Sequence, residues 1–239
     1  RAQIHSTLQA SELGAKSSAG VIAALVMGDQ AEIASSDWQI FRATGVAHLM
    51  SISGLHITML AWLASVLLAW GWRSSARRGS VLCLRLPAPL AASVGGLLVA
   101  LGYAVFCGWG LPAQRTVLML FVLSVLRWQG VRWPWYGSWA LALWVVSVWD
   151  PWALLQASFW LSFVAVGVLF ASGSHAPAST LWAAAQRLWR EQWLMSVCLA
   201  PLTLLLFHQV SVVGLFANLL AVPWVTLVVT PLCLLGLVL

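Results

Sequence analysis

The sequence predicts an all-α, polytopic transmembrane helix bundle, with about seven spans, broken or kinked helices and short interfacial amphipathic helices. Three observations predict this class. Hydrophobic residues make up 62% of the 239 residues, and the mean hydropathy is +0.91. Charged residues make up only 8%, whereas soluble domains carry about 25%, so the chain cannot cover itself with a solvated surface. The 17 tryptophans fit the same class, because indole rings settle at the membrane–water interface.

Residues 1–43 differ in composition from the transmembrane domain that we predict at residues 44–239. This first segment holds four of the six acidic residues and many serines and alanines. Its one apolar patch, GVIAALVMGD, is shorter than the roughly 20 residues that a bilayer span requires. We therefore predict an external or interfacial segment of one or two amphipathic helices. Because the chain opens on Arg1 and ends in an apolar run, we expect it to be a piece of a longer protein.

Seven apolar runs follow, each of roughly the length that can cross a bilayer. The last run contains Pro223 and Pro231, and each proline removes a backbone donor and clashes with the preceding turn. We expect this run to be kinked or divided into two shorter helices, which a membrane tolerates where protein surrounds the break. The predicted spans are residues 46–71, 89–108, 112–128, 134–149, 152–171, 192–208 and 213–238.

The loops between these spans predict the orientation of the chain. Arginines occur in the first, third and fifth loops, whereas the second, fourth and sixth loops are neutral or acidic. By the positive-inside rule the arginine-bearing loops are cytoplasmic, which places residues 1–43 on the outer side. Residues 176–190, in the fifth loop, are predicted to form a short amphipathic helix in the cytoplasmic interface. The loop arginines are Arg73, Arg77, Arg78, Arg85, Arg127, Arg132, Arg187 and Arg190.

The first span opens on a polar stretch, HLMSISGLHITML. In a helix, Ser53 and His56 share one face because they lie three residues apart, and His48 and Ser51 share a neighbouring face. Together the four cover more than half of the circumference, which excludes a lipid-facing helix. Gly54 lies among them and weakens the helix at that point. We predict that all five residues face inward, toward protein or water.

Other polar residues occur at similar depth in later spans. Arg115 follows Pro112 at the start of the third span, and an intramembrane charge is costly enough to mark a pathway or a pair. Gln156, Ser158 and Asn218 are further candidates in the fifth and last spans. Ser162, Thr226 and Thr230 are predicted only to pack, because such side chains often bond to their own helix or to a neighbour. Since arginines far outnumber acids, an anionic partner would fit the surplus.

At these residues the sequence resembles the ComEC competence family, the inner-membrane DNA-uptake proteins of naturally transformable bacteria. The long string FRATGVAHLMSISGLHI resembles the signature of that family. Arg115 resembles the arginine of an Arg-Ala pair, although Thr116 replaces the alanine here. Further matching elements follow in the expected order; they are LVMGD at 25–29, DPWALLQASFWLSF at 150–163, Pro201, and FHQVSVVGLFANLLAVP at 207–223.

The resemblance implies a channel that conducts single-stranded DNA across the bacterial inner membrane during natural transformation. It implies flanking OB-like and metallo-β-lactamase-like domains, with a cytoplasmic ATPase or DNA-binding proteins as further partners. No catalytic residue, cofactor or metal is expected in this chain, which lacks an H-x-H-x-D motif. Under this reading Tyr103, Phe106 and Trp109 are candidates to stack on unpaired bases. The candidates for the DNA path are Arg42, His48, Ser51, Ser53, Gly54, His56, Arg115, Gln156, Ser158 and Asn218.

Three alternative functions remain open at this point. A secondary transporter for a small solute would also have broken helices and polar residues at midplane, but we find no inverted repeat and few acids. An intramembrane serine protease could use Ser53 with His56 or His208, although Ser53 and His56 would lie on one turn. A metal site at His48 and His56 is disfavoured, because their spacing matches no standard ligand pair.

Overall fold

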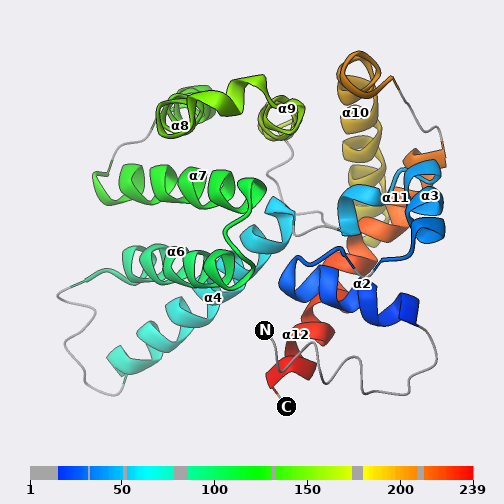
Figure 1. Ribbon diagram of the computed structural model, residues 1–239. Helices are drawn as coiled ribbons and strands as arrows, with labels where there is room; N and C mark the ends of the chain where they lie inside the picture. Colours follow the sequence, from blue (N-terminus) through cyan, green and yellow to red (C-terminus); the bar gives the residue numbers. More distant parts are fainter. Residues whose placement is uncertain are drawn as a thin grey trace. The chain divides into compact units, whose positions relative to one another are not determined.

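The computed structural model describes residues 16–31, 33–50, 53–77, 86–130, 133–173, 180–208 and 213–238, and every regular element in these ranges is a helix (Figure 1). The all-α prediction is therefore confirmed for the described residues. The chain divides into two compact units. The central unit is Ser53–Pro151, and the terminal unit combines Arg1–Ile52 with Trp152–Leu239. Each unit is described by itself below.

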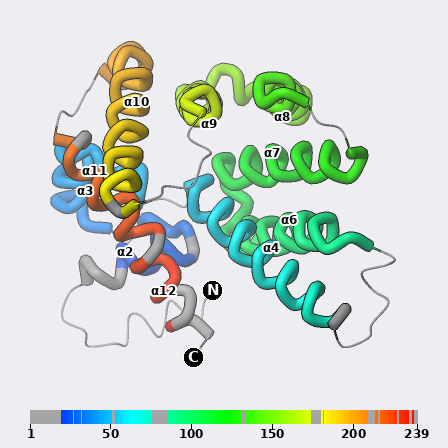
Figure 2. The backbone as a smooth tube through the Cα atoms, turned by 180° about the vertical axis from the view of Figure 1, so that it is seen from behind, coloured from blue at the N-terminus to red at the C-terminus, as the bar shows by residue number. Residues whose placement is uncertain are grey.

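The central unit is a series of helical hairpins made of α4 (Gly54–Arg77), α6 (Ala88–Phe106), α7 (Leu111–Trp128) and α8 (Trp135–Trp149). Figures 1 and 2 show α6 between α4 and α7, with α8 on the far side of α7. The N-terminus of α4 lies against that of α7, since Gly54 is close to Thr116, and the short turn at 107–110 brings the C-terminus of α6 to the same end. The negative charge of Asp150 acts on Arg115, so the C-terminus of α8 also lies near this end.

Small residues let α4 and α6 approach each other closely. The buried face of α6 repeats every four residues, which is close to one helical turn. Ser65 on α4 donates hydrogen bonds both to the carbonyl of Ala61 in its own helix (2.7 Å) and to Ala92 across the interface (3.0 Å). Small side chains and hydroxyl bonds of this kind are typical of packed helices in membranes. The buried residues of α6 are Ala88, Ala92, Ser93, Gly96, Ala100 and Ala104.

The terminal unit joins the two ends of the sequence. Residues Ala24, Ile33, Leu49 and Met50 form a buried core, against which side chains such as Trp38 and Val222 pack. Helix α12 packs on α2, α10 packs on α9, and α11 packs on α10. The elements are α2 (Lys16–Met27), α3 (Ser35–Ala43), η1 (Ala47–Met50), η2 (Pro151–Leu155, which begins at the last residue of the central unit), α9 (Ala157–Ala171), α10 (Leu181–Phe207), α11 (Val213–Trp224), η3 (Val225–Val229) and α12 (Thr230–Val238).

Three of the predicted spans are long and apolar enough to cross a membrane: Gly54–Ser75, Ala88–Phe106 and Leu111–Trp128. Helices α8 and α9 are apolar but have only 15 residues each. The prediction of seven spans is thus met for three, and the other four remain predictions.

Several boundaries differ from those predicted. The first span does not begin at residue 46, because Ala47–Met50 is a separate short helix and α4 begins at Gly54. Residues 176–179 lie outside the described residues, and residues 181–190 do not form a helix of their own, since one continuous helix runs from Leu181 to Phe207 and joins them to the predicted sixth span. Hydropathy detects the change in composition along α10, but a change in composition does not end a helix.

The first and last predicted elements also show distinct features. Four consecutive residues of α2, from Ala23 to Val26, are buried, so this helix is a core element and not one with a single apolar face. In the last run, a π-helical segment at Val225–Val229 lies between Pro223 and Pro231. Proline removes a helical donor, and π segments are frequently found at functional sites.

Candidate functional site

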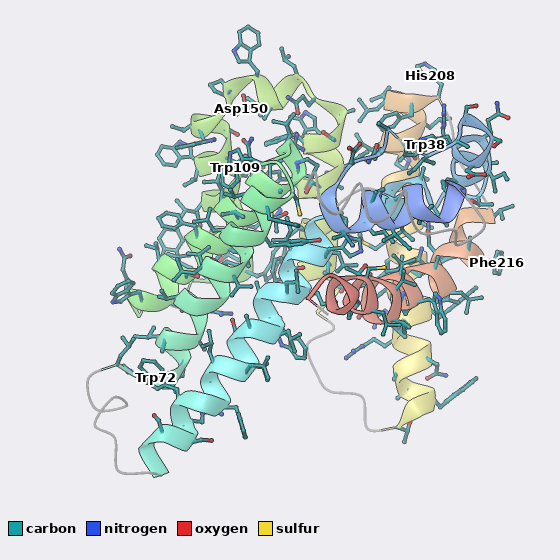
Figure 3. The ribbon with its side chains drawn as sticks, turned by 60° about the horizontal axis from the view of Figure 1, so that its bottom comes forward. Trp38, Trp72, Trp109, Asp150, His208 and Phe216 are labelled. Atoms are coloured by element: carbon teal, nitrogen blue, oxygen red, sulfur yellow. The ribbon has the colours of Figure 1, made fainter. Side chains whose placement is uncertain are left out.

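Polar side chains gather at one end of the central unit, where α4 and α7 begin and α8 ends. Figure 3 shows Trp109 and Asp150 toward this end and Trp72 at the opposite one. We call the group Ser53, His56, Trp109, Arg115 and Asp150 the polar end. Its members come from the residue before α4, the first turn of α4, the α6–α7 turn, α7 and the C-cap of α8.

Ser53 and His56 form a reciprocal cap at the start of α4. The Ser53 carbonyl accepts the backbone N–H of His56 at 3.1 Å. In return His56 Nδ1 lies 3.4 Å from the Ser53 backbone nitrogen and 3.3 Å from Ser53 Oγ. The contact between Nδ1 and the Ser53 N–H is one half of a capping box, with imidazole in the position usually taken by Glu or Gln. Since a backbone N–H can only donate, Nδ1 is the acceptor, and a neutral ring then carries its proton on Nε2.

The side chain of His56 is fully buried, with 0% of its surface exposed. The prediction that His56 faces away from lipid therefore agrees with its placement. The interpretation of both residues as members of one helical face needs correction, because Ser53 lies just outside the helix and caps it. The cap uses the short polar side chain that an N-cap position favours.

Gly54 brings α4 against α7. A Cβ atom at position 54 would lie only 2.6 Å from Oγ1 of Thr116, a distance that real Cβ contacts do not reach. Thr116 is held in place because its hydroxyl donates to the carbonyl of Pro112 at 2.9 Å. Gly54 therefore serves close helix packing.

Arg115 is buried within the same end, with 4% of its surface exposed. The negative charge of Asp150 interacts favourably with its guanidinium. The prediction that Arg115 marks a pathway or a charge pair stays a prediction. A charge withdrawn from water inside a protein needs a partner of opposite sign, and Asp150 supplies a negative charge that acts on this arginine.

In the terminal unit, two of the predicted residues contact the carbonyl oxygen of Gly45. His48 Nδ1 lies 3.1 Å from this oxygen, and the amide Nδ2 of Asn218 donates to it at 3.4 Å. Gly45 follows the end of α3 and has a φ of +70°. Its N–H donates to the carbonyl of Arg42, and the N–H of Val46 donates to the carbonyl of Phe41, which closes the helix. His48 and Asn218 thus share one acceptor.

His48 lies in η1 and is exposed. Although water reaches part of the residue, surrounding protein atoms withdraw the ring from solvent and lower the pKa of His48; the hydrogen bond to Gly45 acts in the opposite direction. Lowering the pKa favours the neutral ring near neutral pH.

The remaining predicted residues lie at the surface or near helix ends. Arg42 is exposed in the last turn of α3, where its Nε donates to the carbonyl of Trp38 at 3.3 Å. Gln156 precedes α9 as its N-cap residue, and Ser158 is exposed in the first turn. Ser51 lies outside the described residues. The candidates thus fall into two groups, with Ser53, Gly54, His56 and Arg115 in the central unit and Arg42, His48, Gln156, Ser158 and Asn218 in the terminal unit.

Sequence reasoning missed two features. The approach of Asp150 to Arg115 depends on how α8 packs on α7, which the sequence alone does not show. Thr226 and Thr230, assigned to packing, are buried to 5% and 0% exposure, and their hydroxyls have no hydrogen-bond partner in the structure. The two prolines around them were the available signal. Among the described residues, no three His, Cys, Asp or Glu side chains gather as a metal-ligand set.

Three apolar helices of membrane-spanning length, one of which carries a buried arginine, indicate a polytopic membrane protein. The model of the competence protein family matches residues 25–239. The chain therefore belongs to the competence protein family, and the resemblance drawn from the signature residues is confirmed.

Three relatives illustrate this membership. The chain is 38% identical over 229 residues to Competence protein ComA of Neisseria gonorrhoeae, covering 91% of the chain and 30% of the relative. It is 34% identical over 223 residues to Uncharacterized protein YcaI of Escherichia coli, covering 91% of the chain and 29% of the relative. It is 30% identical over 226 residues to Recombination protein 2 of Haemophilus influenzae, covering 90% of the chain and 28% of the relative. The chain thus spans about three tenths of the length of these relatives. No solved structure matches the chain.

Proposed function

We propose that this chain is the membrane part of a DNA-uptake protein, which conducts single-stranded DNA across the bacterial inner membrane during natural transformation. The observation that carries the proposal is the family match over residues 25–239, together with relatives named as competence and recombination proteins. The buried polar end supports it, because a purely structural bundle has little reason to bury an arginine in an apolar helix.

The electrostatics of the polar end suit an anionic strand. A DNA strand carries a negative charge at each nucleotide and must cross roughly 30 Å of hydrocarbon. The N-termini of α4 and α7 both lie at this end, and each contributes the partial positive charge of its helix dipole. Arg115 adds a full charge, and Asp150 offsets part of it. Contacts of this kind act on phosphate and not on base identity, so they should weaken with salt.

The arginines support a direction of transport. Arg73 lies near the C-terminus of α4 and Arg127 in the last turn of α7, at the end opposite the polar end. Under the positive-inside rule this arginine-bearing end is cytoplasmic, and the polar end faces the outside. The strand would then enter at the polar end and leave past the arginines, where a cytoplasmic ATPase or DNA-binding protein could hold it.

The proposed partners extend beyond this chain. Because the relatives are more than three times as long as the part that matches, there is room for the flanking OB-like and metallo-β-lactamase-like domains that the family resemblance implies. Any nuclease activity would belong to such a domain. For this chain we propose no catalytic role, since the Ser53–His56 pair already has a structural one as a helix cap.

The test is DNA uptake in a transformable host that lacks its own copy of the gene. The gene encoding this chain is supplied, its product is quantified in the inner membrane, and labelled DNA is followed separately in the periplasm and the cytoplasm. We expect labelled strands to accumulate in the cytoplasm only when the gene is present. If the protein reaches the membrane and DNA still stops in the periplasm, the proposal fails.

A small-solute transporter is the second candidate, and one observation favours it. Thr226 lies in the π segment and Thr230 directly after it, both have buried hydroxyls, and broken helices with polar groups mark many solute sites. Replacing both threonines by valine discriminates the candidates. A solute site would lose transport, whereas DNA uptake through a path elsewhere would persist.

A further inference from the structure

The turn between α6 and α7 places a tryptophan in a backbone conformation that bulky residues rarely adopt. Trp109 has a φ of +57°, directly after Gly108 at +93°. Among the described residues, only His208 is another non-glycine residue with positive φ. Such a bulky residue in the left-handed region is an outlier that the surrounding structure must enforce.

Hydrogen bonds on both sides of Trp109 enforce this conformation. Its backbone N–H donates to the carbonyl of Ala104 at 2.8 Å, which is the long bond of a Schellman motif closing α6. Its own carbonyl accepts from the side-chain amide Nε2 of Gln114 at 2.8 Å, one turn into α7. Glycine at position 109 would satisfy the same bonds without strain. The turn therefore does not need tryptophan, and the indole ring itself is the feature to explain.

The position of the ring differs from that of five other tryptophans of the central unit. Trp62, Trp70, Trp128, Trp144 and Trp149 lie on helices and are each more than 60% exposed, as expected for side chains that meet lipid. Trp109 lies on a turn, is only partly exposed, and belongs to the polar end that also holds Arg115 and Asp150 (Figure 3). A half-buried side chain on a backbone that is already fixed loses less conformational freedom when a ligand covers it than a fully exposed side chain does.

We propose that Trp109 is a stacking platform for the unpaired bases of the DNA strand at the polar end. The inference rests on the proposed function, since it requires a single strand to pass this end. Every base has a flat π face, so stacking on indole tolerates any sequence, as a path for arbitrary DNA requires. Arg115 would act on the charge of the strand, and Trp109 on its bases.

The experiment measures binding of a labelled 30-nucleotide single-stranded oligonucleotide to the full-length protein in nanodiscs, over a range of salt concentrations. Trp109 is changed to Phe, Leu or Gly, and Trp149→Leu serves as a matched tryptophan at the same end. We expect Phe to bind within about threefold of the unaltered protein, whereas Leu and Gly weaken binding by about 5- to 100-fold. The slope of affinity against salt should not change, because no charge is removed.

The melting temperatures of the variants show whether weaker binding comes from loss of the indole ring or from a destabilised protein. Trp109→Gly removes the backbone strain and Trp109→Leu keeps it, so the Gly variant should melt no lower than the Leu variant. Weak binding by a stable Gly variant supports the proposal. Binding at the unaltered level by either the Gly or the Leu variant overturns it, as does an equal loss in Trp149→Leu. If the unaltered protein binds no single strand at any salt concentration, the proposed function itself fails, and this inference fails with it.

Discussion

At the scale of single residues, the polar end shows how one sequence signature can be structural and still be positioned for function. Ser53 and His56 belong to the string that marks the family, yet their contacts are those of a helix cap. Arg115 is buried in α7, and the negative charge of Asp150 acts favourably on it. A substitution that removes this negative charge would leave the buried arginine without that interaction. Both pairs must therefore be assessed for stability before any loss of uptake is attributed to transport.

The cap predicts a difference between two substitutions at position 56. His56→Gln keeps an acceptor of the kind that a capping box normally uses, whereas His56→Ala removes the acceptor and leaves a cavity. We expect Ala to lower the free energy of unfolding by about 2 kcal/mol and Gln by less than about 1 kcal/mol. Thermal melting of the purified protein in detergent measures both.

DNA uptake by the same two variants shows whether His56 acts as a helix cap or as a catalytic base. If His56 only caps α4, the Gln variant keeps uptake near the unaltered level. A catalytic base would be lost in both variants, so equal and complete loss of activity from a stable Gln variant would contradict the capping role. Ser53→Ala provides the parallel control, because its backbone N–H and carbonyl remain to cap the helix while the hydroxyl is gone.

At the scale of elements, the position of a helix end decides what a polar residue does. Hydropathy located α4, α6 and α7 correctly, since an apolar run of sufficient length is a local property of the sequence. It could not show that α4 begins at Gly54, because that boundary depends on the Ser53 cap and on contact with Thr116, which comes from another helix. It also divided α10 in two, since composition changes near residue 191 while the backbone continues.

The contact between α4 and α7 predicts opposite outcomes for two glycines of one helix. A side chain at Gly54 would overlap Thr116, whereas nothing lies within 4 Å of a Cβ at Gly71. We expect Gly54→Leu to lower the melting temperature by several degrees and to abolish DNA uptake, because α4 must move away from α7. Gly71→Leu should leave both unchanged. Equal behaviour of the two variants would show that the close approach at position 54 is not needed.

At the scale of the whole molecule, the two ends of the central unit differ in the charge that they carry. The family signature identified the class of protein, and the loop arginines gave an orientation, but neither could reveal that Arg115 meets Asp150 or that Asn218 and His48 share the carbonyl of Gly45. Those pairings join residues far apart in sequence, and they form only when helices pack. The sequence could therefore supply the candidate residues, while their grouping required the fold.

Orientation is the prediction on which the direction of transport depends, and the two ends of α7 allow a direct test. Gly110 at its N-terminus and Gln129 at its C-terminus are both exposed, so a cysteine at either position should be reachable by a thiol reagent. Each is introduced singly into a variant whose four native cysteines, Cys83, Cys107, Cys198 and Cys233, are replaced by alanine. Spheroplasts expose only the outer face of the inner membrane to a reagent that cannot cross it.

We expect Gly110→Cys to be labelled in intact spheroplasts, and Gln129→Cys only after lysis, because the arginine-bearing end faces the cytoplasm. Uptake by both variants confirms that the protein labelled is the active one. The reverse pattern would place Arg115 and Trp109 on the cytoplasmic side, so that the polar end would receive an emerging strand and not an entering one. Labelling of both positions before lysis would mean that α7 does not cross the membrane at all, and a path for DNA along this unit would then have no physical basis.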